Sequence, residues 1–204
     1  MPSAAYPDAL LELMELLRGL PGVGRRSAER MALQLYSWEP DRLSVLAESL
    51  ATLHDRIGVC PECGAMSSGP GELCGICSSP LRDAAQICVV EDFPQMRSIE
   101  AGGVYKGRYH ILGGTLAPLE GRLACSLSID PLLKRIDAGG VREVILALSP
   151  DVEGQATSIY LANLRKDKPV RISRPAPGRP AGADLSYADP ATVAAALNGR
   201  TVFD

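Results

Sequence analysis

The sequence lacks the long apolar runs of membrane proteins, because no uninterrupted apolar segment approaches the ~20 residues that a membrane-spanning helix requires. It also lacks a secretory signal at its start, since residues 1–7 contain no basic segment followed by an apolar run. An overall positive charge is absent too: 21 basic and 24 acidic residues give a net charge of -3. We therefore expect a cytoplasmic protein without a membrane contact, in which any affinity for an anionic polymer comes from local patches.

Two stretches of the chain concentrate basic side chains. In residues 18–30, Glu29 is the single acidic residue beside Arg18, Arg25, Arg26 and Arg30. In residues 165–182, Asp167 is the single acidic residue beside Arg165, Lys166, Lys168, Arg171, Arg174 and Arg179. Both stretches are candidate surfaces for a polyanion, because a local cluster of charge attracts phosphates even where the whole molecule does not.

The most specific pattern in the chain is a set of two Cys-x-x-Cys pairs separated by ten residues: Cys60, Cys63, Cys74 and Cys77. Two such turns can offer four thiolates to one Zn²⁺ and complete its tetrahedron, which is typical of a structural site. The intervening loop is rich in glycine and cannot build a core, so its fold is expected to depend on the metal. Two disulfides or buried free thiols are the alternatives, although disulfides are rare in cytosolic chains. Cys88 and Cys125 lie outside this pattern and are interpreted as core thiols.

The N-terminal part of the chain predicts two helices joined by a tight hairpin. Apolar residues at helical spacing indicate a helix over residues 7–20. In the sequence of residues 20–24, Leu-Pro-Gly-Val-Gly, proline fixes one turn position, and the two glycines are free to adopt positive φ. A second helix is expected to begin near Arg26, with a buried face formed by Ala28, Met31, Ala32 and Leu35.

This stretch resembles the helix-hairpin-helix motif of DNA-binding proteins. In that motif, backbone N–H groups of the glycine hairpin and of the following helix hold a phosphate oxygen without reading a base. The resemblance implies DNA contacts at Gly22, Gly24, Arg25, Arg26 and Arg30. An ordinary helix turn with surface arginines is the alternative, because glycine-rich turns before helices are common.

A third helix, with Asp41 as its cap, is predicted to run to Ile57 and to pack His54 near its apolar face. After Pro80, short apolar strands alternate with helical stretches, and the strands are expected at 87–90, 109–112, 144–148 and 170–173. This alternation indicates an open α/β sheet, in which functional groups gather at the carboxyl ends of the strands.

Three carboxylates follow predicted strands: Glu91, Asp151 and Glu153. The arrangement resembles the Toprim fold of topoisomerases, primases and some nucleases, where a Glu and an Asp-x-Asp-x-Glu-Gly run hold Mg²⁺. Such oxygen ligands would position a divalent ion against phosphate. The run is incomplete, because Ser149 stands where the first Asp belongs. The other interpretations are that these carboxylates cap and solvate strand ends, or contact a partner.

The order of helix-hairpin-helix, four-cysteine site and Toprim-like sheet resembles the RecR family of bacterial recombination mediators over nearly the whole chain. Further family-like stretches are 89–91, 107–114, 152–157 and 185–189. The resemblance implies a non-enzymatic DNA-binding component of the RecFOR recombinational repair pathway, associated with the nucleoid. It also implies a structural zinc ion and a ring-shaped homotetramer that binds double- and single-stranded DNA and works with RecO and RecF to load RecA.

We accordingly predict an α/β chain with an all-α N-terminal part. The expected divisions are a helix-hairpin-helix domain (1–56), a four-Cys zinc finger (57–80), a Toprim domain with an open parallel sheet (81–174) and a C-terminal arm with a helix (175–204). The alternative function is a Mg²⁺-dependent Toprim nuclease or topoisomerase-like enzyme that uses the three carboxylates. Incubation with Mg²⁺ and nicked, gapped or supercoiled DNA distinguishes the two.

Overall fold

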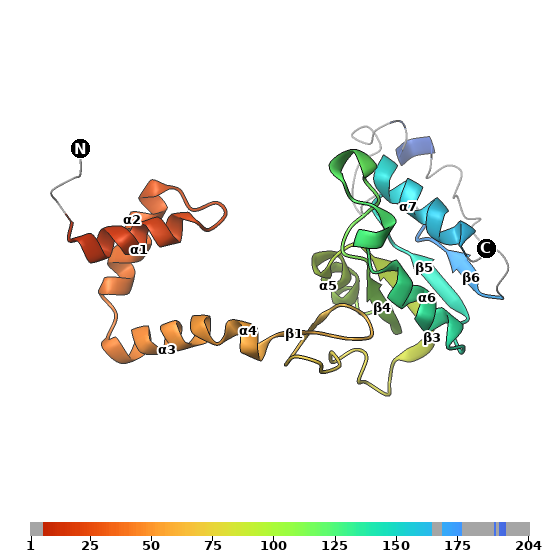
Figure 1. Cartoon of the computed structure of the whole chain (residues 1–204), viewed down its shortest axis with the longest axis horizontal. Coiled ribbons are helices and arrows are strands. Elements are labelled where there is room, and N and C mark those ends of the chain that lie inside the picture. Colours follow the sequence, from red (N-terminus) through yellow and green to blue (C-terminus); the bar gives the residue numbers. More distant parts are fainter. Residues whose placement is uncertain (1–5, 165–168, 177–189, 191, 195–204) are drawn as a thin grey trace. The chain divides into compact units, whose positions relative to one another are not determined.

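A computed structural model describes residues 6–164, 169–176, 190 and 192–194 (Figure 1). The chain forms two compact units, Met1–Arg56 and Ile57–Asp204. In the part of the chain that the structure describes, no helix has both the length and the apolar character needed to cross a bilayer. The predicted fold class is confirmed, because the first unit is all-helical and the second contains a parallel sheet with helices.

The first unit contains the helices α1 (Asp8–Arg18), α2 (Arg25–Tyr36), α3 (Pro40–Ala51) and α4 (Leu53–Arg56). Helices α1 and α2 pack through Met14, Ala28 and Ala32, and partly buried leucines of α1 surround this small core. The alanines allow the two helix backbones to approach closely. The prediction for Met31 was wrong, because this residue is 40% exposed.

The predicted third helix is interrupted. Helix α3 begins at Pro40, with Glu39 as its N-cap residue, so Asp41 lies in the first turn and is not the cap. Proline favours this position because its fixed φ suits the first helical turn and its missing N–H would have had no helical partner. The helix ends at Ala51, with Thr52 as its C-cap residue, and α4 follows as a single short turn. His54 is exposed on α4, so the expectation of a packed histidine was wrong.

The second unit contains a four-stranded parallel sheet with strand order β4-β3-β5-β6 (Figure 1). Its strands are β3 (Asp83–Val90), β4 (Gly107–Ile111), β5 (Glu143–Leu146) and β6 (Arg171–Ser173). The connections contain α5 (Phe93–Ala101), the 3-10 helices η1 (Pro118–Glu120) and η2 (Ala124–Ser126), α6 (Ile129–Asp137) and α7 (Val152–Asn163). The chain leaves β3 toward β4 and later returns to β5 on the other side, so the topological switch point lies between β3 and β5.

Both faces of the sheet are covered, and the strands therefore carry continuous apolar runs. On one face, Cys88 and Val90 of β3 pack with Met96 of α5. On the other face, Ile87 and Val89 pack with residues of α6 and α7 (Figure 1). The predicted strands are all present, although β3 begins four residues before the apolar run. These first residues, Asp-Ala-Ala-Gln, are not fully buried and carry no apolar run that would mark them as strand.

The cysteine-bearing segment belongs to the same compact unit as the sheet. It contains a two-residue antiparallel ladder between β1 (Gly58–Val59) and β2 (Met66–Ser67). Gly58 is required there, because a Cβ atom at this position would lie 2.1 Å from the backbone oxygen of Gly69. The division into a separate zinc finger and a C-terminal arm stays a prediction. Most of the expected arm, including the family-like stretch 185–189, lies outside the described residues.

Candidate metal centre and nucleic-acid interface

The four paired cysteines converge on one point in the second unit. Their sulfur atoms all lie within 4.8 Å of one another, and all four residues are buried: Cys60, Cys63, Cys74 and Cys77. A tetrahedral zinc site with ~2.3 Å Zn–S bonds places its sulfurs about 3.8 Å apart. The distance of 3.5 Å between Cys63 Sγ and Cys74 Sγ is close to that value. The donor set therefore fits a metal such as zinc.

The turns that carry these cysteines point backbone N–H groups at sulfur. Ala65 donates to Cys63 Sγ and Cys77 donates to Cys74 Sγ, each at 3.4 Å. A hydrogen bond from the Cys77 thiol, with smaller contributions from the backbone N–H of Ala65 and the thiols of Cys74 and Cys60, lowers the pKa of the Cys63 thiol to about 5. Burial raises the pKa of the Cys74 thiol, and the bond to Cys63 raises the pKa of the Cys77 thiol. Zinc requires thiolate ligands, and the two backbone donors favour that form at Cys63 and Cys74.

The two remaining cysteines differ from each other. Cys88 is buried in β3, and burial raises the pKa of its thiol to about 12, as expected for an unreactive core residue. Cys125 is exposed in η2, so its interpretation as a core thiol was wrong. Cys125 lies in a loop without helical or strand periodicity, and the sequence there gives no signal that separates a buried cysteine from an exposed one.

The hairpin between α1 and α2 is a tight turn closed by a hydrogen bond of 3.1 Å from Val23 N to Leu20 O. Gly22 has φ +79°, which side chains other than glycine rarely adopt. Gly24 has φ -81° and is the extended N-cap residue of α2. Val23 packs against the core of the first unit. Of the two glycines that could adopt positive φ, only Gly22 does so.

The N-terminus of α2 carries positive charge and no compensating acid. Its cap makes no side-chain hydrogen bond, and its first turn contains no acidic residue. Arg25, Arg26 and Arg30 are exposed, and the last two line an open hollow with Glu29. Glu29 accepts a hydrogen bond of 2.7 Å from the hydroxyl of Tyr6. Arginines at a helix N-terminus oppose the helix dipole, and a bound anion would relieve that repulsion.

The Toprim-like carboxylates do not converge as metal ligands. Glu91 Oε1 accepts a hydrogen bond of 2.5 Å from Ser149 N across the switch point. Asp151 caps α7 by accepting from Gly154 N at 2.7 Å, and Glu153 is exposed in the first turn of that helix. Within the described ranges, the four cysteines are the one group of three or more potential ligands close enough to share a metal. The geometry therefore gives no support to Mg²⁺ binding by these carboxylates.

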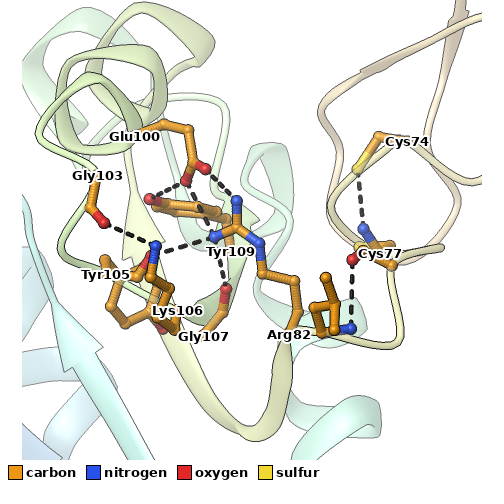
Figure 2. A network of polar contacts seen from close by, with 11 residues as sticks. Cys74, Cys77, Arg82, Glu100, Gly103, Tyr105, Lys106, Gly107 and Tyr109 are labelled. Atoms are coloured by element: carbon orange, nitrogen blue, oxygen red, sulfur yellow. Dashed lines mark hydrogen bonds and ion pairs between the residues drawn. The ribbon is translucent and has the colours of Figure 1, made fainter.

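Two polar networks beside β4 were missed by the sequence analysis. Arg82 forms an ion pair with Glu100, and Glu100 also accepts a hydrogen bond of 2.8 Å from Tyr109 (Figure 2). This pair lowers the pKa of the Glu100 carboxyl, chiefly through the bond from Arg82. On the same strand, buried His110 contacts Ser128 O through Nε2 at 2.7 Å. These partners are distant in sequence, and no local pattern pairs them.

Comparison with known proteins finds three matching family models and many similar full-length proteins. The model described as "RecR, helix-hairpin-helix" matches residues 10–54, "Toprim domain" matches 85–176, and "RecR, C-terminal" matches 180–201. "Recombination protein RecR" of Syntrophobacter fumaroxidans is 44% identical over 203 residues, covering 100% of both chains. The protein of the same name from Hyphomonas neptunium is 46% identical over 197 residues, covering 97% of this chain and 96% of the relative. The Thermus thermophilus relative is 44% identical over 195 residues, covering 96% and 97%. At this identity over the full length, the chain belongs to the RecR family of recombination proteins.

Proposed function

We propose that this protein is a DNA-binding mediator of RecFOR-type recombinational repair, which acts as an oligomeric clamp and adaptor that helps load RecA on single-stranded DNA. The observation that carries the proposal is the hairpin, in which an uncapped helix N-terminus is surrounded by exposed arginines. The names of the relatives, "Recombination protein RecR", support the pathway. The site of action is then the nucleoid in the cytoplasm.

The DNA contact is assigned to the hairpin and the first turns of α2. Free backbone N–H groups at residues near Gly22 and Gly24 can donate to a phosphate oxygen, while Arg25, Arg26 and Arg30 supply charge. These groups would contact the phosphate backbone and not the edges of the bases. Binding is therefore expected to be independent of sequence on both double- and single-stranded DNA, and strongly dependent on salt.

The metal at the four cysteines is proposed to be zinc with a structural role. All four ligand positions of a tetrahedral ion are filled by protein sulfurs, which leaves no open position for substrate or water. Zinc would cross-link the two Cys-x-x-Cys turns. The four cysteines would provide the thiolates, and backbone N–H groups of the turns would donate to the sulfurs.

We further propose that the Toprim-like edge performs no chemistry. Glu91 and Asp151 are engaged with backbone N–H groups, and Ser149 occupies the position of a metal-binding Asp in the resembled motif. Pure protein incubated with Mg²⁺ and nicked, gapped or supercoiled DNA should leave the DNA intact. Cleavage or relaxation that disappears in Glu91→Gln would favour the nuclease or topoisomerase-like alternative.

Retention on DNA is proposed to require a closed homo-oligomer, a ring-shaped tetramer that also contacts RecO and RecF. One small arginine patch on a chain with net charge -3 makes few phosphate contacts, and each contact contributes about -0.9 to the salt slope. Identical patches around one duplex act at high effective concentration and so hold DNA at physiological salt. Closed symmetry is the usual way for a homo-oligomer to arrange them.

Testing this assembly requires a substitution outside the core of the first unit. Leu10 and Leu13 pack against that core, so charged residues there would disturb folding as well as assembly. We place a subunit contact on the leucine-rich helix α1, where Leu16 is 76% exposed and can be substituted without disturbing that core. Leu16→Glu should give a folded protein that is monomeric by light scattering and no longer retains DNA. A folded monomer that binds DNA with unchanged affinity would show that the ring is unnecessary.

The DNA contact is tested by a double substitution, Arg26→Ala with Arg30→Ala. The double variant should bind all DNA sequences more weakly and show a flatter dependence of affinity on salt, because two phosphate contacts are lost. Arg42→Ala with Arg56→Ala removes the same charge from the same unit and should bind normally. Equal binding by the two double variants at moderate salt would show that the hairpin is not the contact surface.

A further inference from the structure

Among the strands that the structure describes, β3 alone pairs with β4, so β4 is an edge strand of the parallel sheet. An edge strand presents one row of backbone groups that no neighbouring strand satisfies, and such a row pairs readily with other chains unless it is covered. In this protein, several outward groups of β4 have partners from outside the sheet. Gly107 O accepts from Arg82 at 3.5 Å, and Tyr109 O accepts from Arg135 at 2.8 Å (Figure 2 shows the first).

The third outward group is covered by the cysteine loop itself. Ile111 N donates to the backbone oxygen of Cys63 at 2.7 Å, on the side of the strand opposite to β3. The next residue, Leu112, donates in the other direction to Val90 O of β3 at 2.9 Å. The hydrogen exchange of these two successive amides therefore measures two different contacts. The Ile111 amide reports on the cysteine loop, and the Leu112 amide reports on the sheet.

The loop is fitted closely against this edge. The guanidinium of Arg108 on β4 contacts Glu62 Oε2 at 3.2 Å. Gly64 has φ +77°, and a Cβ atom there would lie 3.3 Å from Ile111 O. The four cysteines also share one apolar cluster with β3, β4 and α5. By contrast, the loop contains little apolar material of its own, so its shape is expected to depend on the ligands that its cysteines bind.

We propose that the cysteine loop is the cover of the β4 edge, and that metal at the four cysteines holds this cover in place. The metal then has a role beyond local folding. It keeps the outward amide of Ile111 bonded to the loop, so that this amide cannot pair with another strand. The side chains of Arg82 and Arg135 reach β4 without the loop, so the carbonyl groups of Gly107 and Tyr109 should stay bonded when the metal is lost. The inference rests on the metal binding proposed above.

Hydrogen exchange of the full-length protein with single-residue resolution by mass spectrometry tests the inference. Metal content is measured first. Protein that binds no zinc would refute the proposed metal site, but it would not refute the contact of the cysteine loop with the β4 edge. On removal of zinc with a chelator, the Ile111 amide should exchange at least about 100-fold faster. The Leu112 amide and the Ala147 amide, which donates to Val89 O at 2.9 Å, should change less than about 3-fold.

Two other outcomes would overturn the proposal. Unchanged exchange at Ile111 in zinc-free protein would show that the loop stays on the edge without metal. Equal acceleration at Ile111, Leu112 and Ala147 would show that the metal holds the whole sheet and not its edge. A Cys77→Ser variant purified without zinc gives a second route to the metal-free state and should reproduce the Ile111-specific pattern without a chelator.

Discussion

Glu91 accepts a hydrogen bond of 2.5 Å from the backbone N–H of Ser149, which joins the carboxyl ends of β3 and β5 at the topological switch point. Gln95 extends this link, since its Oε1 accepts from Glu91 N at 2.9 Å and its Nε2 contacts Ser149 Oγ at 3.3 Å. Open α/β folds bind ligands at this crevice. Here the carboxylate bonds to the protein backbone.

We predict that Glu91→Ala lowers the free energy of unfolding by about 1–3 kcal/mol, because a partly buried amide loses a charged acceptor. Glu91→Gln should cost less, since its amide oxygen can still accept from Ser149. Urea denaturation measures both values. Glu153→Gln, on an exposed side chain of the same region, is the control and should match the wild type. Wild-type stability of Glu91→Ala would argue that the carboxylate is kept for a ligand.

Each of the substitutions Cys60→Ser, Cys63→Ser, Cys74→Ser and Cys77→Ser should reduce zinc content and stability together. The physical reason is that binding of a structural metal contributes directly to the free energy of folding. Cys125→Ser removes an exposed thiol and should leave the zinc content and the melting temperature unchanged. The measurements are elemental analysis and thermal unfolding. Active, folded protein without stoichiometric zinc would contradict the prediction.

The stability of the protein should fall as pH decreases from about 6.5 toward 4, because burial lowers the pKa of His110 to about 4 in the folded state. The unfolded state then binds a proton that the folded state does not, so protonation favours unfolding. The contribution of His110 is fully present above pH ~6.5, and about 2 kcal/mol of it is lost by pH ~5.

Urea denaturation at two pH values measures this dependence. The variant His110→Asn should lose part of it, whereas His54→Asn removes the exposed second histidine and should keep the wild-type dependence. Equal pH dependence in both variants would show that His110 does not cause the effect. Carboxyl groups titrate in the same range, and the comparison of variants subtracts their contribution.

The network of Arg82, Glu100 and Tyr109 should stabilise the contact between α5 and β4. Tyr109→Phe removes the hydroxyl that donates to Glu100 at 2.8 Å, with an expected cost of about 1–3 kcal/mol because the acceptor is charged. Tyr105→Phe removes a hydroxyl that donates to a neutral carbonyl, Arg108 O, at 3.0 Å, and should cost less. A double-mutant cycle between Tyr109→Phe and Glu100→Gln measures their coupling. Strict additivity would contradict a shared network.

The two hairpin glycines should respond differently to alanine. Gly22→Ala should destabilise the first unit by about 1–2 kcal/mol, because φ +79° is unfavourable for a residue with a Cβ atom. Gly24→Ala should fold normally, since φ is -81° and no atom lies within 4 Å of an added Cβ. Circular dichroism during thermal unfolding compares the two variants. Equal stability would show that the turn relaxes at Gly22.

The elements whose signals are local were predictable from the sequence. The Cys-x-x-Cys spacing predicted all four cysteines of the candidate metal centre, because the two cysteines of each pair lie on one short turn. The Leu-Pro-Gly-Val-Gly stretch predicted the hairpin, because proline fixes φ and glycine allows positive φ independently of the rest of the fold. The apolar runs at 87–90 and 144–148 predicted buried parallel strands, because a strand covered on both faces carries a continuous apolar run.

Tertiary structure decided which distant groups meet. The strand order brings β3 beside β5, and only then can Glu91 bond to Ser149. Likewise, the bond between Ile111 and Cys63 arises because the cysteine loop folds over the free edge of β4. Hydrophobic periodicity specifies which face of an element is buried, but it carries no information about which polar groups at the ends and edges of elements will pair. The sequence therefore determined the modules and the four cysteines of the candidate metal centre, whereas three-dimensional packing determined the hydrogen-bond partners of the carboxylates and the position of the loop.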